Sequence, residues 1–169
     1  MSPAMDSSNT TSYERLVHLL EDGGARFRFI DHAPEGRTEF VSALRGHHPH
    51  QAAKCLVLMV KVGKKVTKFV LAVVPGDTRV DPDAVKRLMS GTYAGFASAA
   101  DAERVTQCVT GTVLPFAFSG DLTLIADPAV IENDEIYFNA GRLDRSVAVD
   151  AKDYMRIAQP RLEKIARDA

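Results

Sequence analysis

Hydrophobic and polar positions follow two different periods along the first part of this chain. Residues 13–22, "YERLVHLLED", place their apolar side chains on one face of a helix. Residues 25–31, "ARFRFID", alternate arginine with phenylalanine, which is the period of a half-buried strand. After a loop, we expect Thr38 to be the N-cap of a two-turn helix that ends near Gly46.

The longest apolar pattern covers residues 54–74, "KCLVLMVKVGKKVTKFVLAVV". Two aliphatic, β-branched runs are joined at Gly63-Lys64-Lys65, so the segment predicts a β-hairpin. Because its first arm is apolar on both faces, we expect that arm to be central in a sheet.

Helix signals follow the hairpin. Asp81 as N-cap, Pro82 in the first turn and Gly91 as terminator predict one helix. Ser98 and Asp101 have the spacing of a capping box at the start of a second helix.

The last third contains three strand candidates, at 122–127, 135–141 and 146–150. A helix is expected from about 151 to 166, kinked or split at Pro160. This order of elements favours a mixed α/β fold whose sheet is mixed or largely antiparallel, with helices packed around it. We expect one domain over residues 13–169 after a disordered tail, 1–12.

Composition narrows the class of protein. The formal charge is −1, from 21 basic and 22 acidic residues, which argues against a protein that coats nucleic acid. No apolar run is long enough for a membrane span, and the N-terminus lacks the pattern of a secretion signal. Cys55 and Cys108 are far apart and form no disulfide framework, so a reducing cytoplasm fits best.

Several common enzyme classes lack their motifs here. There is no G-x-G-x-x-G, no Walker loop and no zinc-ligand set, and we expect neither a cofactor nor a metal. His47, His48 and His50 share one loop without a nearby Cys, Asp or Glu, which favours a solvated loop over a metal site. No serine lies in G-x-S-x-G, and all five histidines fall in the first third of the chain, which argues against a hydrolytic triad.

The role of Lys54 and that of the lysines in the predicted hairpin can each be interpreted in two ways. Lys54 opens an apolar strand and either extends into water or meets a phosphate or polarised carbonyl in a pocket; spacing alone favours the first. The lysines around the hairpin turn either keep the protein soluble or contact a nucleic-acid backbone, and again the solvated interpretation is favoured. They are Lys61, Lys64, Lys65 and Lys68.

The segment "VTGTVLPFAF", 109–118, also has two interpretations. It is either a turn into a strand or a stiffened loop that presents backbone amides to a ligand. Gly111 permits close approach to the backbone, and Pro115 fixes the end of the loop.

Six segments together resemble the YbaK family, which is related to the editing insertion domain of bacterial prolyl-tRNA synthetase. They are "HAPEGRT" (32–38), "AAKCLVL" (52–58), "FVLAVVPGDTRVD" (69–81), "VTGTVLPF" (109–116), "LIADPAV" (124–130) and "IYFNAGRLDRSVAV" (136–149). The resemblance runs from about residue 13 to 154. It implies a curved, mostly antiparallel sheet surrounded by short helices.

The resemblance also implies an activity: hydrolysis, in trans, of the ester that joins a wrong amino acid to the terminal adenosine of tRNA. The tRNA acceptor end is then the partner, a cognate aminoacyl-tRNA synthetase is a further candidate, and no membrane is involved. The chemistry is plausible without a nucleophilic side chain, because the ester is already activated and needs a positioned water or ribose hydroxyl and oxyanion stabilisation.

Residue roles follow from the same resemblance. Lys54 would lie near the terminal adenosine and the ester, and the loop amides would face the scissile carbonyl. The implied catalytic residues are Lys54, Gly111, Thr112, Val113, Leu114 and Pro115. The implied substrate-binding residues are Thr38, Phe116, Asp127, Asn139, Ala140, Gly141 and Arg142. We therefore predict that the amides from Gly111 to Leu114 point into the same pocket as the Lys54 ammonium.

The substrate amino acid stays open. Editing domains that clear alanine use a histidine late in the chain, whereas this chain has none after His50. A small residue such as Cys, Ala or a Pro-like one is expected. One alternative is a noncatalytic module that binds tRNA, a nucleotide or a synthetase in the same pocket. Another is an interaction protein whose pocket is filled by side chains.

Overall fold

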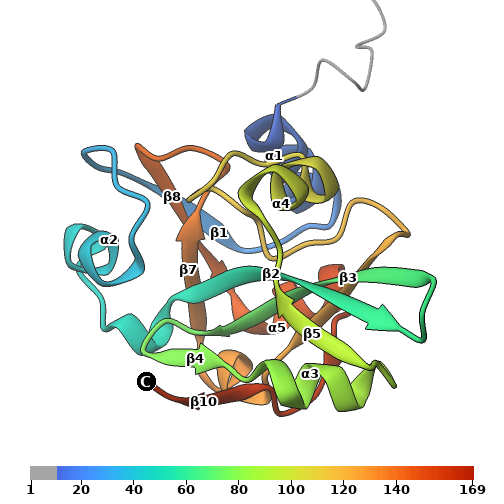
Figure 1. Ribbon diagram of the computed structural model, residues 1–169. Coiled ribbons are helices and arrows are strands. Elements are labelled where there is room, and N and C mark those ends of the chain that lie inside the picture. Colours follow the sequence, from blue (N-terminus) through green and yellow to red (C-terminus); the bar gives the residue numbers. More distant parts are fainter. Residues whose placement is uncertain (1–10) are drawn as a thin grey trace, which may run out of the picture.

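The computed structural model describes residues 11–169 (Figure 1); most of the predicted tail, 1–10, lies outside them. The first helix begins at Ser12, because the Thr11 hydroxyl accepts a hydrogen bond from the Glu14 amide and caps it. The helices are α1 (Ser12–Asp22), α2 (Thr38–Arg45), α3 (Pro82–Leu88), α4 (Ala99–Thr106) and α5 (Ala151–Ala158), with 3₁₀ turns η2 (Pro49–Gln51) and η3 (Pro128–Glu132).

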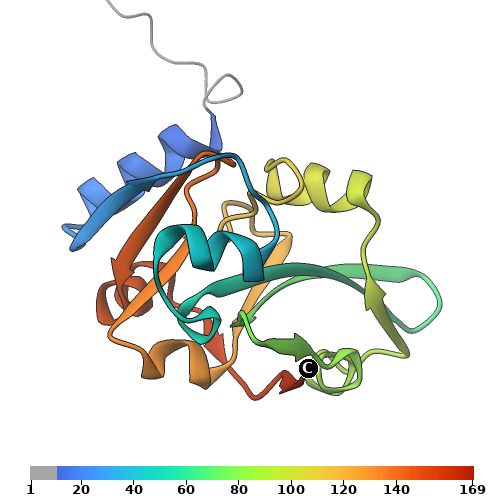
Figure 2. The ribbon, with the colours of Figure 1, turned by 90° about the vertical axis from the view of Figure 1, so that its left-hand side faces the viewer.

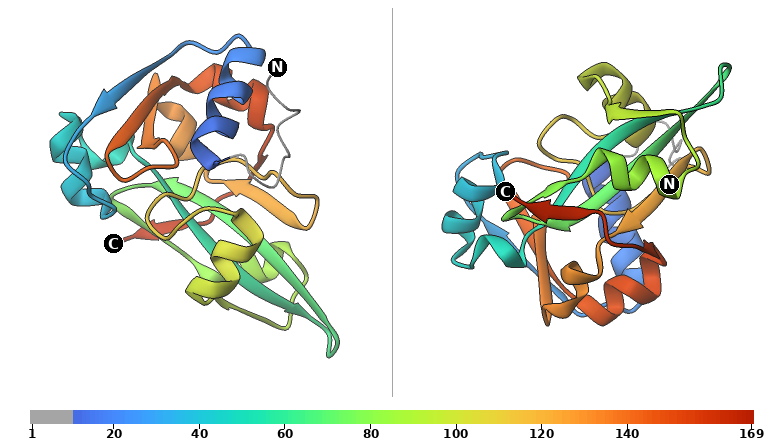
Figure 3. Two further views of the ribbon diagram at one scale, coloured as in Figure 1. Left: turned by 90° about the horizontal axis from the view of Figure 1, so that it is seen from above. Right: turned by 60° about the horizontal axis from the view of Figure 1, so that its bottom comes forward.

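The largest sheet has five strands in the order β5-β2-β3-β6-β9. Strands β2 (Ala53–Val62) and β3 (Val66–Pro75) pair antiparallel over their full length, which confirms the predicted hairpin and the central place of its first arm. The hairpin tip projects from the body of the protein (Figure 3). The other strands are β5 (Tyr93–Phe96), β6 (Leu122–Ala126) and β9 (Arg161–Leu162).

Two smaller sheets complete the fold. Strand β8 (Arg145–Asp150) lies between β1 (Phe27–Asp31) and β7 (Glu135–Asn139), and both pairings are antiparallel. Strand β10 (Ala166–Asp168) pairs with β4 (Thr78–Val80). The two parallel pairings among the named strands both involve β6, which pairs with β3 on one side and with β9 on the other. The expected mixed α/β fold with a mostly antiparallel sheet is confirmed.

Two cores, one on each face of the hairpin, explain why its strands are apolar. Helices lie on both sides of the hairpin (Figure 2). Side chains such as Leu71 and Val73 join α1, α5, β7 and β8 in the first core. Their neighbours Val70 and Ala72 join α3 and Ile165 in the second core. Since successive strand residues point to opposite faces, an apolar run without alternation covers both cores.

Four local predictions were wrong. The N-cap of α2 is Arg37, and Thr38 is the first helical residue. Helix α3 ends at Leu88, and Ser90, not Gly91, takes the left-handed conformation after it. Strand β5 was not predicted.

The last error concerns the C-terminal helix. It ends at Ala158 before Pro160, and the chain after that proline forms β9 and β10 instead of more helix. A proline can end a helix, and here the edges of β6 and β4 then supply partners for the freed backbone groups.

Candidate active site

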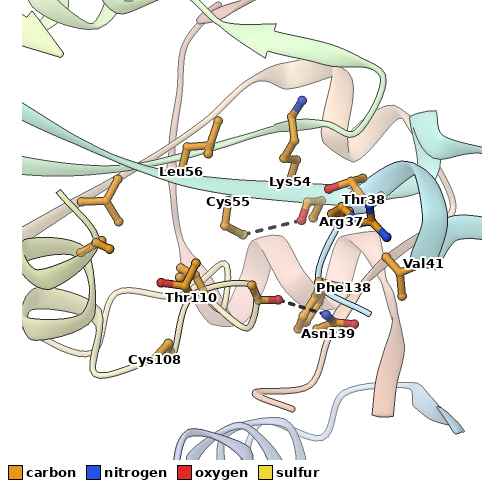
Figure 4. Close-up of a pocket in the computed structure, with 18 of the residues that line it drawn as sticks. Arg37, Thr38, Val41, Lys54, Cys55, Leu56, Cys108, Thr110, Phe138 and Asn139 are labelled. Carbon is orange, nitrogen blue, oxygen red and sulfur yellow. Dashed lines mark hydrogen bonds between the residues drawn. The ribbon is translucent and has the colours of Figure 1, made fainter. Parts of the chain in front are cut away.

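A cavity of about 550 Å³ opens beside β2. It is lined by α2, the first half of β2, the segment from β5 to α4, the loop after α4 and the end of β7 (Figure 4). Five of the predicted site residues line it: Thr38, Lys54, Gly111, Val113 and Asn139. An interaction protein whose pocket is filled by side chains does not match this open space.

Strand β2 separates Lys54 from the loop that contains Gly111. The Lys54 side chain extends on one side of the strand, whereas Cys55, Thr110 and Asn139 lie on the other (Figure 4). The ammonium donates a hydrogen bond to the Thr78 carbonyl, and burial lowers the pKa of Lys54. Lys54, Gly111 and Val113 thus line one cavity, but the ammonium and the loop lie on opposite sides of β2, because neighbouring strand residues point in opposite directions.

The Cys55 side of the cavity is mostly apolar. Small side chains from three elements line it: Ala53, Val57, Ala97, Ala99, Ala102, Cys108 and Val113. The Cys55 thiol donates to the Ala53 carbonyl at 3.6 Å, and burial raises the pKa of this thiol well above its ordinary value. A protonated thiol is a poor nucleophile, so we interpret Cys55 as part of the cavity wall and not as a nucleophile.

The loop after α4 is fixed at its start. The Thr110 amide and hydroxyl both donate to one carboxylate oxygen of Glu103, at 3.0 and 2.8 Å. The Thr112 amide then donates to the Val109 carbonyl at 2.9 Å and closes a turn. Gly111 sits inside this turn with φ of +88°, a conformation that favours glycine.

The remaining loop amides have no such partner. Within residues 11–169, the backbone N–H groups of Gly111, Val113 and Leu114 donate to no other protein group. Gly111 and Val113 line the cavity, whereas Leu114 is buried in the first core. At the loop's end, the Tyr154 hydroxyl donates to the Pro115 carbonyl at 2.8 Å. Two residues with free amides, Gly111 and Val113, therefore line the cavity, and amides of this kind can donate to an anion.

Asn139, at the end of β7, lies across the cavity from α4. Its side-chain Nδ2 lies 2.9 Å from the Glu35 carbonyl oxygen and 3.0 Å from that of Gly111. Its Oδ1 accepts from Arg45 and Ser146. The side chain thus joins three segments of the chain at one wall of the cavity.

Other predicted residues lie away from the cavity. Asp127 is buried and accepts from the amides of Ala129, Ile165 and Ala166, which ties the end of β6 to the C-terminal segment. Phe116 packs in the first core against Phe138 and Tyr154. The remaining residues that do not line the cavity are Thr112, Leu114, Pro115, Ala140, Gly141 and Arg142. Arg142 forms an ion pair with Asp144 at 2.9 Å.

Arg45, the last residue of α2, was not predicted to be a site residue. It lines the cavity, forms no ion pair with a carboxylate of the described residues, and donates to the neutral side chains of Asn139 and Ser146. Burial lowers the pKa of Arg45 to about 10, so the guanidinium is still charged at neutral pH. Nothing in the sequence marks Arg45 as a site residue, because an arginine in the last turn of a helix is normally explained by the helix dipole.

The three histidines of the loop have separate partners. His47 stacks on Tyr137 with ring centroids 3.8 Å apart, and desolvation lowers the pKa of His47 to about 4. The His48 ring caps η2, and His50 contacts Asp77 at 2.8 Å. Across residues 11–169 no three His, Cys, Asp or Glu side chains come close enough together to bind a metal ion.

Comparisons with known proteins show which family the chain resembles. The family model for the aminoacyl-tRNA editing domain matches residues 32–157. The chain is 42% identical over 164 residues to the multifunctional Ser/Thr-tRNA deacylase ProXp-y of Escherichia coli K12, covering 96% of this chain and 98% of that protein.

Two further relatives extend this comparison. A proline–tRNA ligase of Geobacillus thermodenitrificans is 32% identical over 101 residues, which are 54% of this chain and 18% of the ligase. Among solved structures, a candidate trans-editing enzyme for prolyl-tRNA synthetase superposes with a TM-score of 0.75 at 20% identity, covering 94% of this chain and 98% of that one. In the part of the chain that the structure describes, no helix has the length and apolar character needed to cross a membrane.

Proposed function

This chain belongs to the aminoacyl-tRNA editing domain family and hydrolyses mischarged aminoacyl-tRNA in trans, and from this premise we propose which amino acids it removes and which groups perform the reaction. The resemblance to the YbaK family is thereby confirmed. Seryl and threonyl esters are the first candidates, because the 42% identical relative is a Ser/Thr-tRNA deacylase. Alanyl, cysteinyl and prolyl-type esters are the second group.

The Cys55 side of the cavity supports a small substrate side chain. Alanine, valine and cysteine side chains form its walls, and the Thr110 hydroxyl supplies a polar group beside them. Apolar walls discriminate weakly between side chains that differ by one methylene or hydroxyl group, so acceptance of several small amino acids is expected.

The free amides at the cavity wall are the observation that carries the mechanism. An aminoacyl ester needs no strong nucleophile, and its hydrolysis is limited by orientation and by the charge that develops on the carbonyl oxygen. We propose that the N–H groups of Gly111 and Val113 donate to this oxyanion. A water molecule attacks the carbonyl carbon, the bond between this carbon and the tRNA 3′-terminal oxygen breaks, and that oxygen leaves as a hydroxyl with the proton that the water gives up. The ribose hydroxyl next to the ester can orient the attacking water.

Lys54 has a different role in this proposal. Its ammonium lies beyond β2 from the loop, near Thr38 and the Thr78 carbonyl, and no carboxylate of residues 11–169 forms an ion pair with it. We propose that it binds the terminal nucleotide and not the ester oxygen. Because it lacks an acidic partner, the ammonium can give up its hydrogen bond to the Thr78 carbonyl and donate to a phosphate or ribose oxygen instead.

The tRNA acceptor end is the proposed partner, with a synthetase as a further candidate. Because charged tRNA is used in translation, the proposal places the protein in the cytoplasm. The proposed reaction uses no cofactor.

A deacylation panel tests the proposal. The purified protein is mixed with tRNAs charged with Ser, Thr, Ala, Cys or Pro, and release of the labelled amino acid is measured for wild type and Lys54→Ala. We expect fast release of at least one small amino acid and slower release by the variant through a higher KM. Tight binding of charged tRNA without release of any amino acid would support the noncatalytic module instead.

A further inference from the structure

The Asn139 carboxamide has no capacity left for a substrate. A carboxamide has two donor hydrogens and two acceptor lone pairs. Its Nδ2 donates to the Glu35 and Gly111 carbonyls at 2.9 and 3.0 Å. Its Oδ1 accepts from Arg45 at 3.1 Å and from the Ser146 hydroxyl at 2.9 Å. All four positions are occupied, and the residue is only 6% exposed.

Arg45 fixes the direction of this amide. A guanidinium only donates and a carbonyl only accepts, so a flipped Asn139 would place donor against donor on one side and acceptor against acceptor on the other. Ser146 is fully buried and also accepts from the Arg45 Nε at 2.7 Å, which holds the guanidinium beside the amide oxygen. The amide nitrogen therefore always faces the two carbonyls.

The bond to the Gly111 carbonyl controls the loop. In a trans peptide, the carbonyl and the following N–H point in opposite directions. With the Gly111 carbonyl directed at Asn139, the Thr112 amide is directed the other way, where it donates to the Val109 carbonyl at 2.9 Å. This peptide unit is fixed at both ends, and the free amides of Gly111 and Val113 lie on either side of it.

From this geometry we infer that Asn139 is a positioning residue, which holds the Gly111–Thr112 peptide so that the flanking amides face the ester, and does not itself bind substrate. The inference rests on the proposed function. It corrects the role that the family resemblance implied for Asn139, a wall that contacts the substrate.

Asn139→Asp tests the inference, because it keeps size and shape but replaces the donor with an oxygen that faces two carbonyl oxygens. We expect kcat to fall by roughly tenfold or more while KM stays within about twofold of wild type. Because a protonated carboxyl can again donate to one carbonyl, the activity of the variant relative to wild type should rise as the pH is lowered.

Asn133→Asp is the matched control. The Asn133 Nδ2 also donates to two backbone carbonyls, those of His50 and Val130, at 3.2 and 3.4 Å, but the residue does not line the cavity. We expect this variant to keep wild-type kcat and KM. An equal fall in kcat in both variants would mean that the effect is general destabilisation and would overturn the inference.

Amide hydrogen exchange separates this inference from the proposed function. Exchange of a peptide covering residues 108–116 should be faster in Asn139→Asp than in wild type and unchanged in Asn133→Asp, whether or not any tRNA is hydrolysed. Unchanged exchange in Asn139→Asp overturns the positioning role, even if activity is lost, because the residue would then act on the substrate directly. A wild-type protein that hydrolyses no ester contradicts the proposed function alone.

Discussion

Gly36 and Gly111 approach each other so closely that a β-carbon added to either one would lie 3.3 Å from the Cα of the other. The two glycines belong to segments that precede α2 and follow α4, and both line the cavity. Neither backbone can move aside without shifting the wall that carries the free amides. The close approach and the φ of +88° therefore both disfavour a side chain at position 111.

Gly111→Ala should abolish most of the deacylase activity. The added methyl meets the Gly36 backbone and the Leu143 side chain, and a positive φ is strained for alanine, so the loop must shift. Displacing oxyanion donors costs about 10²-fold in kcat. The matched control is Gly120→Ala, where an added β-carbon has no atom within 4 Å. Equal activity of the two variants in a single-turnover assay would contradict the proposed role of the loop.

Asp127→Asn should lower stability and leave the chemistry intact. Asp127 lies outside the cavity, and its Oδ2 accepts from the amides of Ile165 and Ala166 at 2.9 and 2.8 Å. A carboxamide cannot accept all three backbone N–H groups that the carboxylate accepts, so we expect a loss of roughly 3 kcal/mol in the free energy of unfolding. Urea denaturation measures this loss, with the exposed Asp121→Asn as control.

Below its unfolding temperature, Asp127→Asn should keep wild-type kcat. A selective loss of kcat without loss of stability would restore Asp127 to the substrate-binding set.

His47 should make the fold less stable in acid. Its pKa is about 4 in the fold, whereas the unfolded value is near 6.5. Between these values the unfolded chain binds a proton that the folded chain does not. The contribution of His47 to the free energy of unfolding is therefore fully present above about pH 6.5 and is lost as the pH falls to about 4. The effect is on the order of 2 kcal/mol after allowance for partial solvent exposure of the ring.

His47→Phe keeps the ring stacked on Tyr137 and removes the titration. Denaturation curves from pH 4 to pH 7.5 should therefore be flatter for this variant than for wild type or for His18→Gln, a change at an exposed position of α1. Parallel curves for His47→Phe and wild type would show that other groups cause the acid sensitivity.

The proposed tRNA substrate favours the second interpretation of the four lysines around the hairpin tip over the solvated one, so we predict that they contribute to tRNA binding. Lys61, Lys64, Lys65 and Lys68 are exposed, and none forms an ion pair with a carboxylate of residues 11–169. Changing Lys64 and Lys65 to Glu should weaken binding and reduce the slope of log K against log salt by roughly 1.5, as expected for two lost phosphate contacts. The measurement is a filter-binding titration at several salt concentrations.

A double change of Lys152 and Lys164 to Glu alters the net charge equally and serves as control. Equal weakening by both pairs would mean that the tRNA responds to overall charge and not to the hairpin.

The strands could be predicted from the sequence where burial alone sets the pattern. The β2–β3 hairpin was found because its two faces are covered by separate cores, so apolar residues follow one another in the buried part of each arm. Strand β5 was missed because it pairs over only four residues at the sheet edge and two of them, Tyr93 and Phe96, are exposed. Strands β9 and β10 were missed because their short pairings are set by tertiary neighbours and not by their own residues.

The site was predicted less completely than the strands. The resemblance selected Gly111, Val113 and Asn139, which line the cavity, but it could not give the direction of a side chain. Lys54 is the clearest example, since the alternation of β2 turns its ammonium away from the loop. Arg45 was missed because its importance comes from burial beside Asn139, which depends on contacts 94 residues apart in the chain.

The hydrogen bonds of Asn139 also have a kinetic consequence. They join positions that are 104 and 28 residues apart, and each requires a long segment of chain to be closed before it gains stability. Long-range contacts of this kind slow folding and form only when the elements between them are in place. The cavity should therefore be among the last parts of the molecule to assemble, and catalytic activity should return after the bulk of secondary structure during refolding.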